Sequence, residues 1–424
     1  MPLPQLMPTG SPPAGKAPPD GIGAGETTGA AHADGIRDKI RSGVRVNLRL
    51  ALALVFSFTL AARAGDALAL KLQHFVDQHV LAGAVMLVAD KDKVFDIEAV
   101  GYSDLAAQTP MKTNDLFWIA SMSKPVTCAA LMMLVDARKV SLDDPVEKYI
   151  PEFKAAKVAL TNGALVAPSH PIKIREILSH TSGLGFLNAR DKQRIDSVPL
   201  AESIRHDLLE PLKFDPGTGY SYSNEGIDAA GRIIEIVSGM PYEQFLQERL
   251  FTPLRMTDTT FFPSEAQLRR LAKCYQTNPH TNGLVEAPIQ FLVQPLGGPS
   301  HYAAPGGGLF STASDVTRFC QMLANGGIFE GKTCLSREAV RAMTSKQTPP
   351  TVQNNYGFGL GLSASDGSSF GHSGAYKTDM CVDHGRIRVF LVQQASGWAD
   401  GNPEGEFNTE AARLFPPPAA DPRD

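Results

Sequence analysis

A serine and a lysine stand three positions apart in the stretch Ala120-Ser121-Met122-Ser123-Lys124-Pro125. Pro125 has no backbone N–H and fits a helix only in its first turn, so we expect a helix that begins near Ser121. At this spacing the two side chains project from one helix face. A serine hydroxyl is a weak nucleophile until a base takes its proton, and a lysine whose pKa is lowered by burial is such a base. The helix N-terminus adds positive potential where an oxyanion would form.

The spacing of Ser121 and Lys124 does not by itself define a site. A chain of this length contains about one S-x-x-K by chance, and a solvated pair on a surface helix is the alternative. Two later stretches supply possible partners. Tyr222 and Asn224 lie about 100 residues downstream, just before a predicted helix, and a tyrosine can share protons with an amine while an asparagine both donates and accepts. Each of these two residues, taken alone, is also compatible with a loop or helix cap.

The third stretch is Gly371-His372-Ser373-Gly374, which lies where a strand is expected. An imidazole can be cationic or donate hydrogen bonds, and Gly374 permits close approach of the backbone. A structural role for His372 is the alternative. The three stretches together would supply a nucleophile, a base, a proton-sharing phenol and a polar strand edge, which is a set suited to acyl transfer.

Composition excludes several other classes of protein. The 424 residues are 43% hydrophobic and carry a net charge of −4, so the chain can build a large core or two smaller ones, and nothing favours nucleic acid as a partner. Five cysteines are widely spaced without a C-x-x-C, which indicates neither a disulfide framework nor a zinc site, although one or two bridges stay open. H-E-x-x-H is absent. We expect no metal or organic cofactor.

Residues 1–64 are predicted to be a leader and a signal peptide. The first 44 or so are rich in Pro, Gly and Ala and predict disorder. Three arginines then precede an apolar run, Leu50 to Ala62, that ends in Ala62-Arg63-Ala64. This order is typical of a secretory signal peptide, at about 41–64, and the run is too short to span a bilayer. We therefore expect an exported, periplasmic or secreted protein that meets a membrane only during export; a buried helix is the alternative.

Strand patterns lie at both ends of the remaining chain and helical patterns in the middle. We expect an α+β fold in which one antiparallel sheet is built from both chain ends and flanked by helices, with a mostly helical lobe inserted at about 150–290. The domain is predicted to span 65–395, and a short helix with a Pro-rich tail follows at 396–424. The expected strands are 83–88, 94–100, 356–362, 369–372, 380–383 and 387–394. Ser314 and Asp315 are the expected cap of a helix over 314–325.

The order S-x-x-K, Y-x-N, then a basic residue followed by Ser-Gly resembles the penicillin-recognising serine hydrolases. That family includes class C β-lactamases, D-alanyl-D-alanine peptidases and esterases of the same fold. The resemblance covers roughly residues 65–395. Four further stretches of the sequence are also similar to the family: Trp118-Ile119-Ala120-Ser121, Leu142-Asp143-Asp144-Pro145, Leu178-Ser179-His180-Thr181-Ser182-Gly183-Leu184 and Pro216-Gly217-Thr218-Gly219-Tyr220-Ser221-Tyr222-Ser223-Asn224.

The resemblance implies a role for each residue of the three stretches. It makes Ser121 the acylated nucleophile and Lys124 a general base, and it implies two-step acyl transfer to water. The substrates it implies are a small-molecule ester, a β-lactam or a peptide. The remaining implied roles are proton transfer for Tyr222, substrate orientation for Asn224, the basic position of the third motif for His372, close approach for Gly374, and an oxyanion hole made by the N–H groups of Ser121 and Ala375.

One departure from the family bears on the substrate. Many lactamases of the family carry a lysine where His372 stands. A lysine keeps its charge at neutral pH, whereas a histidine with a pKa near 6.5 mostly does not. This argues against strong recognition of a penicillin carboxylate and favours ester or peptide hydrolysis. Lys377 would restore a positive charge if it faced the site, but we expect it to face solvent.

Two competing interpretations remain. Gly367-Ser368-Ser369-Phe370-Gly371 matches the G-x-S-x-G elbow of α/β-hydrolases, with Asp379 and His384 as partners, but no alternating strand–helix pattern surrounds it. A cell-wall peptide-binding protein without catalysis is the second. The sequence predicts a serine hydrolase, most simply an esterase or β-lactamase-like enzyme, with a D-alanyl-D-alanine-type peptidase or a true β-lactamase as alternatives.

Overall fold

The structure is a computed structural model that describes residues 66–187, 194–281, 283–299, 301–364 and 366–417. The predicted leader and signal peptide, residues 1–64, lie outside the described residues. All the described residues belong to one unit of the chain, Phe56–Asp424.

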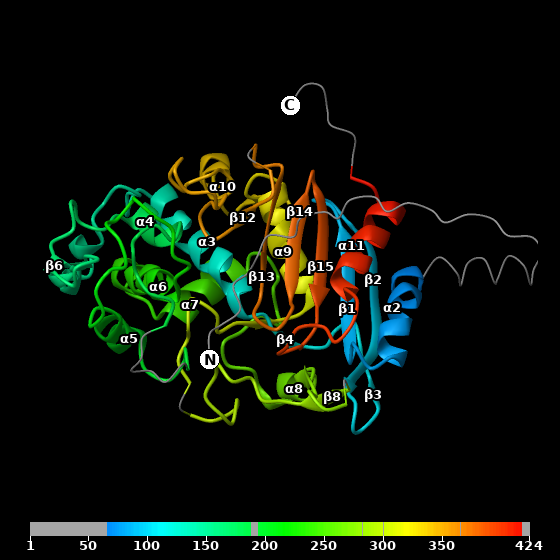
Figure 1. The fold of residues 1–424 in the computed structure, drawn as a ribbon. Coiled ribbons are helices and arrows are strands. Elements are labelled where there is room, and N and C mark those ends of the chain that lie inside the picture. The colour runs from blue at the N-terminus through cyan, green and yellow to red at the C-terminus, as the bar shows by residue number, and fades with distance from the viewer. Residues whose placement is uncertain (1–65, 188–193, 282, 300, 365, 418–424) are drawn as a thin grey trace, which may run out of the picture. The chain divides into compact units, whose positions relative to one another are not determined.

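A seven-stranded antiparallel sheet forms the centre of this unit, in the order β12-β13-β14-β15-β1-β2-β3 (Figure 1). β1 and β15 come from opposite ends of the chain and pair in the middle of the sheet, with Val85 opposite Leu391 and Leu87 opposite Val389. The prediction of one sheet built from both chain ends is therefore confirmed. The strands are β1 (Gly83–Ala89), β2 (Val94–Asp104), β3 (Thr109–Pro110), β12 (Gly361–Leu362), β13 (Ser369–Ser373), β14 (Asp379–Asp383) and β15 (Arg386–Leu391).

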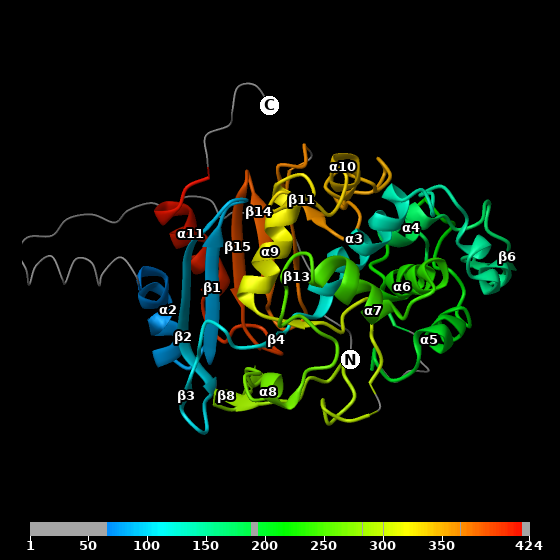
Figure 2. The same cartoon turned by 180° about the vertical axis from the view of Figure 1, so that it is seen from behind.

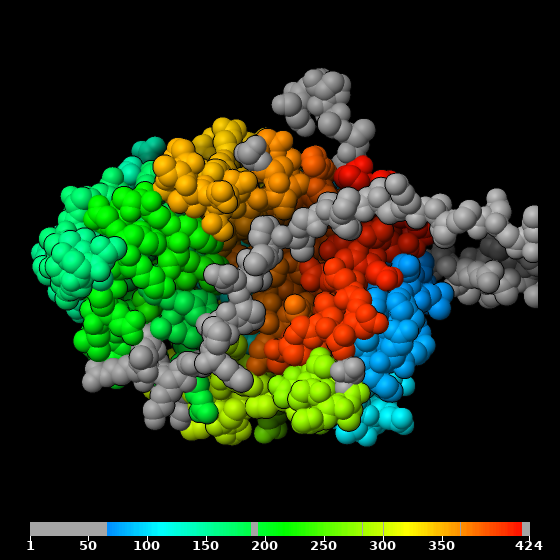
Figure 3. All heavy atoms as spheres, viewed as in Figure 1, coloured from blue at the N-terminus to red at the C-terminus, as the bar shows by residue number. Residues whose placement is uncertain are grey.

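Helices cover both faces of the sheet. α2 (Ala67–Asp77) and α11 (Pro403–Leu414) lie on one face and α9 (Ala313–Ala324) on the other, as the two opposite views show (Figures 1 and 2). Successive side chains of a strand point to opposite faces. Met86 of β1 accordingly packs in the cluster under α2 and α11, and Leu87 in the cluster under α9. In the space-filling view the surface of α11 adjoins that of α2 (Figure 3).

The helices between the two groups of sheet strands pack largely around α3 (Ser123–Asp136) and the helix that lies along it. α3 is buried on nearly every side, and α6 (Asn224–Ser238) packs along it. Smaller hairpins and turns connect the helices. The other helices are α4 (Ile174–Leu178), α5 (Leu200–Asp207), α7 (Tyr242–Leu246) with a π-turn at Gln247–Phe251, α8 (Glu265–Leu268) and α10 (Arg337–Met343).

The remaining strands form two-residue and three-residue pairs outside the large sheet. The pairs are β4 (Phe117–Trp118) with β9 (Phe310–Ser311), β5 (Val158–Ala159) with β6 (Leu165–Val166), β7 (Tyr275–Thr277) with β8 (Leu284–Glu286), and β10 (Ile328–Phe329) with β11 (Lys332–Thr333). Short 3-10 turns occupy Ala120–Met122, Val146–Lys148 and Pro151–Ala155.

Two local predictions were wrong. The strand expected over 356–362 is limited to β12, because Gly359 adopts φ +73° and a Cβ there would lie 2.7 Å from Cys128 Sγ of α3. The preceding loop is thus shaped by contact with a helix and not by strand pairing. The cap of α9 is Thr312, whose hydroxyl accepts the Asp315 N–H at 3.3 Å, and the helix begins before the expected cap residue Ser314.

Candidate active site

Ser121 lies in the 3-10 turn between β4 and α3, where its side chain is half-buried. β4 is held in place because it pairs with β9 and because Trp118 Nε1–H donates to Gly307 O at 2.7 Å. Ala120 adopts φ +46°, a left-handed conformation that costs a residue with a Cβ about 1 kcal/mol. The surrounding contacts therefore hold the serine on a strained turn at the N-terminal end of a helix.

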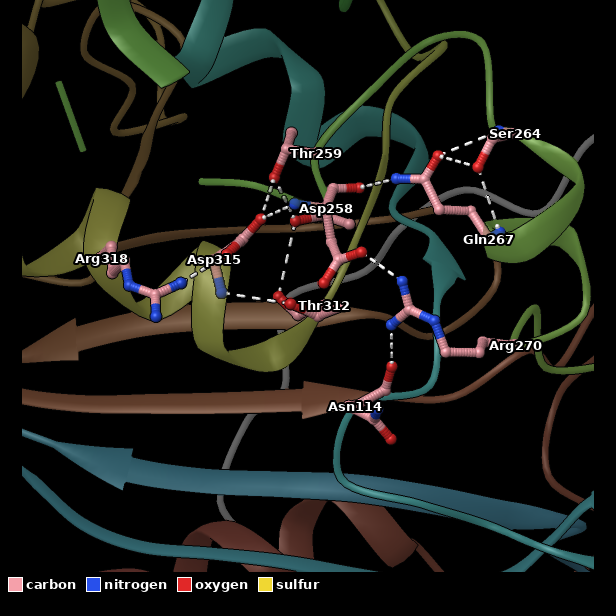
Figure 4. A network of polar contacts seen from close by, with 10 residues as sticks. Asn114, Asp258, Thr259, Ser264, Gln267, Arg270, Thr312, Asp315 and Arg318 are labelled. Carbon is pink, nitrogen blue, oxygen red and sulfur yellow. Dashed lines mark hydrogen bonds and ion pairs between the residues drawn. The ribbon is translucent and has the colours of Figure 1, made fainter. Parts of the chain in front are cut away.

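A polar network ties α9 to the chain that enters β4 (Figure 4). Asp315, buried in the first turn of α9, accepts the backbone N–H of Asp258 at 2.7 Å. Arg270 pairs with the Asp258 carboxylate and donates to the carbonyl of Asn114 at 2.5 Å. The carbonyl of Arg270 in turn accepts the N–H of Leu116 at 2.8 Å. This network positions the segment that leads directly to the Ser121 turn.

Lys124 is completely buried in the first turn of α3. Its Nζ donates to Asn224 Oδ1 and to Gly306 O, both at 2.6 Å, and lies 3.1 Å from Ser121 Oγ. Burial lowers the pKa of Lys124 to about 7, against the opposing effect of the Asp228 carboxylate. A neutral amine has two N–H groups and one lone pair. Because two oxygen acceptors take the N–H groups, the lone pair of a neutral Lys124 faces the Ser121 hydroxyl.

Tyr222 stands just before α6, which Ser223 caps by accepting a backbone N–H at 2.9 Å. The Tyr222 hydroxyl interacts with the Ser121 side chain and lies 3.3 Å from His372 Nε2. Lys124 Nζ lies 4.6 Å from the centre of the Tyr222 ring, so the lysine meets the ring face. Burial raises the pKa of Tyr222 far above its ordinary value, which keeps its hydroxyl protonated at neutral pH.

The third stretch lies at the end of β13 against the approach to the nucleophile. His372 Nδ1 lies 2.8 Å from Ser373 O, and its Nε2 faces Tyr222. A Cβ on Gly374 would lie 2.6 Å from Ile119 O, so only a glycine allows the chain to pass this close to the Ser121 turn. Ala375 follows with an exposed residue surface. The five predicted side chains are therefore brought together, and Gly374 and Ala375 run beside them.

The positive charge at this edge of the sheet is small. Burial and the nearby Lys124 amine lower the pKa of His372 to about 3, so the ring is neutral at pH 7. Lys377, the alternative cation, lies with its Nζ 5.8 Å from the ring centre of Trp398 and interacts with Glu404. Lys377 is thus directed toward the α11 side.

Three residues of this group had no role assigned from the sequence. Tyr356 Oη lies 3.0 Å from His372 Nε2 and 3.2 Å from His180 Nε2. Asp228 accepts the Gly306 N–H at 3.1 Å. Asp228 comes one helical turn after Asn224, so helical spacing alone could have pointed to it. His180 lies in one of the stretches that resemble the family, whereas Tyr356 lies in a segment that was expected to be a strand.

The G-x-S-x-G stretch does not form a nucleophile elbow. Ser369 lies in β13, where it is 5% exposed, and its hydroxyl donates to the Asp383 carboxylate. A strand in an antiparallel hairpin replaces the strand–turn–helix that the elbow requires. His384 lies 3.5 Å from Ser369 Oγ and 2.9 Å from Asp383 Oδ1. The Ser369 hydroxyl therefore donates its hydrogen bond to the carboxylate and not to the imidazole.

The described part of the chain also bears on the expectations for disulfides, metal sites and membrane spans. All five cysteines are free thiols, and Cys128 is buried in the core. Within the described ranges, no group of three or more His, Cys, Asp or Glu side chains is arranged to hold a metal ion. No helix among the described residues combines the length and the apolar character needed to cross a membrane.

Comparison with known proteins identifies the family. The family model described as Beta-lactamase matches residues 68–412. Protein Rv1367c of Mycobacterium tuberculosis is 35% identical over 315 residues, which cover 68% of this chain and 76% of that protein. The chain belongs to the beta-lactamase family. This confirms the resemblance inferred from the three stretches.

Other members of the beta-lactamase family that resemble the chain include named esterases and penicillin-binding proteins. Esterase EstB of Burkholderia gladioli is 30% identical over 273 residues, covering 58% of this chain and 67% of that protein. Penicillin-binding protein 4* of Bacillus subtilis is 27% identical over 333 residues, covering 74% and 68%. The solved structure of EstCE1, a hydrolase with promiscuous acyltransferase activity, has a TM-score of 0.67 at 24% identity and covers 85% of this chain and 99% of its own. The β-lactamase-like fold is thereby shown.

Proposed function

We propose that the protein is a serine esterase that forms an acyl-enzyme on Ser121. The observation that carries this proposal is the environment of Lys124. A buried amine with a pKa near 7, both N–H groups engaged and its lone pair toward Ser121 Oγ at 3.1 Å is suited to general-base catalysis. Its N–H acceptors are Asn224 and Gly306.

The proposed acylation proceeds from this geometry. Ser121 Oγ attacks the ester carbonyl carbon, and its proton passes to the Lys124 amine. The backbone N–H groups of Ser121 and Ala375 stabilise the oxyanion, which is the reason for the close passage of Gly374. When the tetrahedral intermediate collapses, the alcohol leaves with the Tyr222 proton, and the Lys124 ammonium beside the ring returns a proton to the phenolate. Asn224, which already accepts from Lys124, would donate from its amide to the substrate.

Hydrolysis of the acyl-enzyme would use the same groups in reverse. A water molecule takes the place of the alcohol, loses its proton to the neutral Lys124 amine, and attacks the acyl carbonyl. The Lys124 ammonium then returns that proton to Ser121 Oγ, which leaves as the free hydroxyl. We prefer an ester to a β-lactam or peptide because His372 is neutral at pH 7, and because esterase EstB and lovastatin esterase of Penicillium rubens are each 30% identical to this chain.

Intact-protein mass spectrometry tests the proposal. The protein is incubated with p-nitrophenyl butyrate or with a penicillin, and any adduct is mapped to its residue, with the Ser121→Ala variant as the control. We expect turnover of the ester and a butyryl adduct on Ser121 that the variant does not form. A long-lived penicillin adduct would indicate a peptidase, rapid penicillin hydrolysis a β-lactamase, and an adduct on Ser369 would contradict the assignment of the nucleophile. Absence of both adduct and turnover would favour the peptide-binding protein.

We also propose that the protein is exported. The basic flank and apolar run of the predicted signal peptide, at about 41–64, support export to the periplasm or beyond. Peptide sequencing of the mature N-terminus after secretion from an expressing cell would test it, with cleavage close to Ala64 as the expected result.

A further inference from the structure

Three side chains, His180, Tyr356 and His372, form a chain of hydrogen bonds that ends at the proposed active site. The backbone N–H of Ser223 donates to His180 Nδ1 at 3.2 Å, His180 Nε2 lies 3.2 Å from Tyr356 Oη, and Tyr356 Oη lies 3.0 Å from His372 Nε2. Tyr222 Oη lies beside the end of this chain, 3.3 Å from the same Nε2. His180 and Tyr356 are buried, and they come from segments 176 residues apart in sequence.

The direction of each bond in this chain follows from its two ends. An N–H group can only donate, so Nδ1 of His180 is an acceptor and its neutral ring carries the proton on Nε2. A carbonyl can only accept, so His372 donates from Nδ1 to Ser373 O and its neutral ring accepts at Nε2. His180 therefore donates to Tyr356 Oη, and Tyr356 donates to His372. Burial lowers the pKa of His180 well below its ordinary value, in agreement with a neutral ring.

Protonation of His372 would disrupt this arrangement. A proton on His372 Nε2 would turn the acceptor into a donor that faces Tyr356 Oη, where His180 already donates. The Tyr356 hydroxyl proton would then lose its acceptor in a buried position, which costs about 1–3 kcal/mol. The chain of bonds therefore opposes a charge on His372.

The other groups around His372 either disfavour a positive charge on its ring or already interact with other side chains. Lys124 opposes a second positive charge in the site. The Tyr222 hydroxyl is neutral. On the neighbouring strand the Asp379 carboxylate carries a negative charge, and it accepts from Ser373 Oγ at 2.7 Å and interacts with Arg388.

We propose that Tyr356 and His180 are positioning residues that hold His372 as a neutral acceptor, so that the site selects substrates without a carboxylate next to the scissile bond. This inference rests on the proposed ester hydrolysis and specifies its substrate class. A cationic residue at the position of His372 would attract a substrate carboxylate, whereas a neutral imidazole whose lone pair is occupied does not. The substrate class is therefore an ester that is uncharged on the side that meets β13.

The same bonds determine what the Tyr222 hydroxyl can do. His372 Nε2 has one lone pair, and Tyr356 contacts it at 3.0 Å while Tyr222 is 3.3 Å away. Since Tyr356 takes this lone pair, the proton of Tyr222 stays available to Ser121 and to the leaving alcohol. Removal of the Tyr356 hydroxyl would let Tyr222 donate to His372 and would withdraw that proton from the reaction.

The Tyr356→Phe variant removes one hydroxyl and leaves the ring. Tyr220→Phe is the matched control, because Tyr220 lies 5.9 Å from the rings of both His180 and Tyr356 and its hydroxyl makes no hydrogen bond within the described part of the chain. Two esters of similar length are compared at pH 6, neutral p-nitrophenyl butyrate and the anionic mono-p-nitrophenyl ester of succinic acid. For Tyr356→Phe we expect kcat for the butyrate to fall about fivefold to tenfold, from the loss of one hydrogen bond, with KM little changed. The succinate ester should react through the protonated form of the His372 ring, whose small fraction at pH 6 rises tenfold for each unit of His372 pKa. The preference for the butyrate ester over the succinate ester should therefore fall about tenfold per unit.

A titration of the His372 ring by ¹⁵N NMR supplies a readout that does not need turnover. In the wild-type protein we expect the proton on Nδ1 and no protonation above pH 5, and in Tyr356→Phe we expect the titration to move up by about one pH unit or more. Identical titrations and identical ester preferences in the wild type, Tyr356→Phe and Tyr220→Phe would overturn the inference. If the wild type hydrolysed neither ester but its His372 titration shifted in Tyr356→Phe, the proposed function would fail while the control of His372 by Tyr356 would stand.

Discussion

The Asp228→Asn variant should shift the pH dependence of ester hydrolysis to lower pH. Asp228 Oδ1 accepts the Gly306 N–H at 3.1 Å, and Gly306 O accepts from Lys124 Nζ at 2.6 Å. Asparagine keeps the oxygen that accepts this N–H and removes the negative charge. The carboxylate raises the pKa of Lys124 against the effect of burial, so its removal lowers that pKa below its value of about 7.

The size of the shift follows from the separation of the two charges. One glycine residue lies between them, which places them about 7 Å apart given ordinary backbone dimensions. At an effective dielectric constant of about 20, two unit charges at this distance interact by roughly 2 kcal/mol. This interaction corresponds to about 1.5 pKa units. Since Lys124 acts as a base only when it is neutral, the rising limb of the pH–rate profile should move downward by about one unit or more.

The assay measures kcat/KM for p-nitrophenyl butyrate between pH 5 and pH 9, with each reaction stopped before the product is quantified. For the wild type we expect the half-maximal value near pH 7, and for Asp228→Asn near pH 5.5 to 6. Glu235→Gln is the control, because Glu235 lies on the same helix, about two turns further along, and pairs with Arg232 at 2.7 Å. A half-maximal pH in Asp228→Asn that matches the wild type, or that moves upward, would refute the assignment of Lys124 as the base.

Three further predictions concern the proposed oxyanion donor, the cap of α9 and the buried carboxyl group of Glu98. Gly374→Ala should lose more than a hundredfold in kcat while it stays folded by circular dichroism, because the new Cβ would lie 2.6 Å from Ile119 O and would displace the proposed oxyanion donor; activity within tenfold of the wild type would contradict that role. Thr312→Ala should lower the free energy of unfolding in urea by about 1 kcal/mol, since it removes the cap of α9, and exposed Thr409→Ala should change it less. Burial raises the pKa of Glu98 in the folded state to about 7, so ionisation of this carboxyl favours the unfolded chain, and the wild type should lose stability as pH rises from 4.5 through 7. Glu98→Gln should remove that loss. Equal slopes of unfolding free energy against pH in the two proteins would show that Glu98 does not cause it.

Much of the fold could be predicted from local patterns. β1 is recognisable as a continuous apolar strand because it is buried on both faces in the middle of the sheet, and the strand patterns near the C-terminus indicated the other half of that sheet. The S-x-x-K spacing and the Pro after it placed Ser121 and Lys124 on one face at the start of a helix. The strand expected over 356–362 failed because its backbone follows the surface of α3, a contact that has no local signature.

In the candidate site, the sequence determined which functional groups are present, and the tertiary structure decided their properties. The residue types at Ser121, Lys124, Tyr222, Asn224 and His372 were determined by the sequence, because each chemistry needs a particular functional group and short-range spacing orients it. Their properties were decided by tertiary structure. The pKa of Lys124 depends on complete burial by several elements, and the neutrality of His372 depends on Tyr356 and His180, which come from distant segments. Desolvation and hydrogen-bond direction are properties of the whole environment of a group, and a one-dimensional pattern contains only its neighbours along the chain.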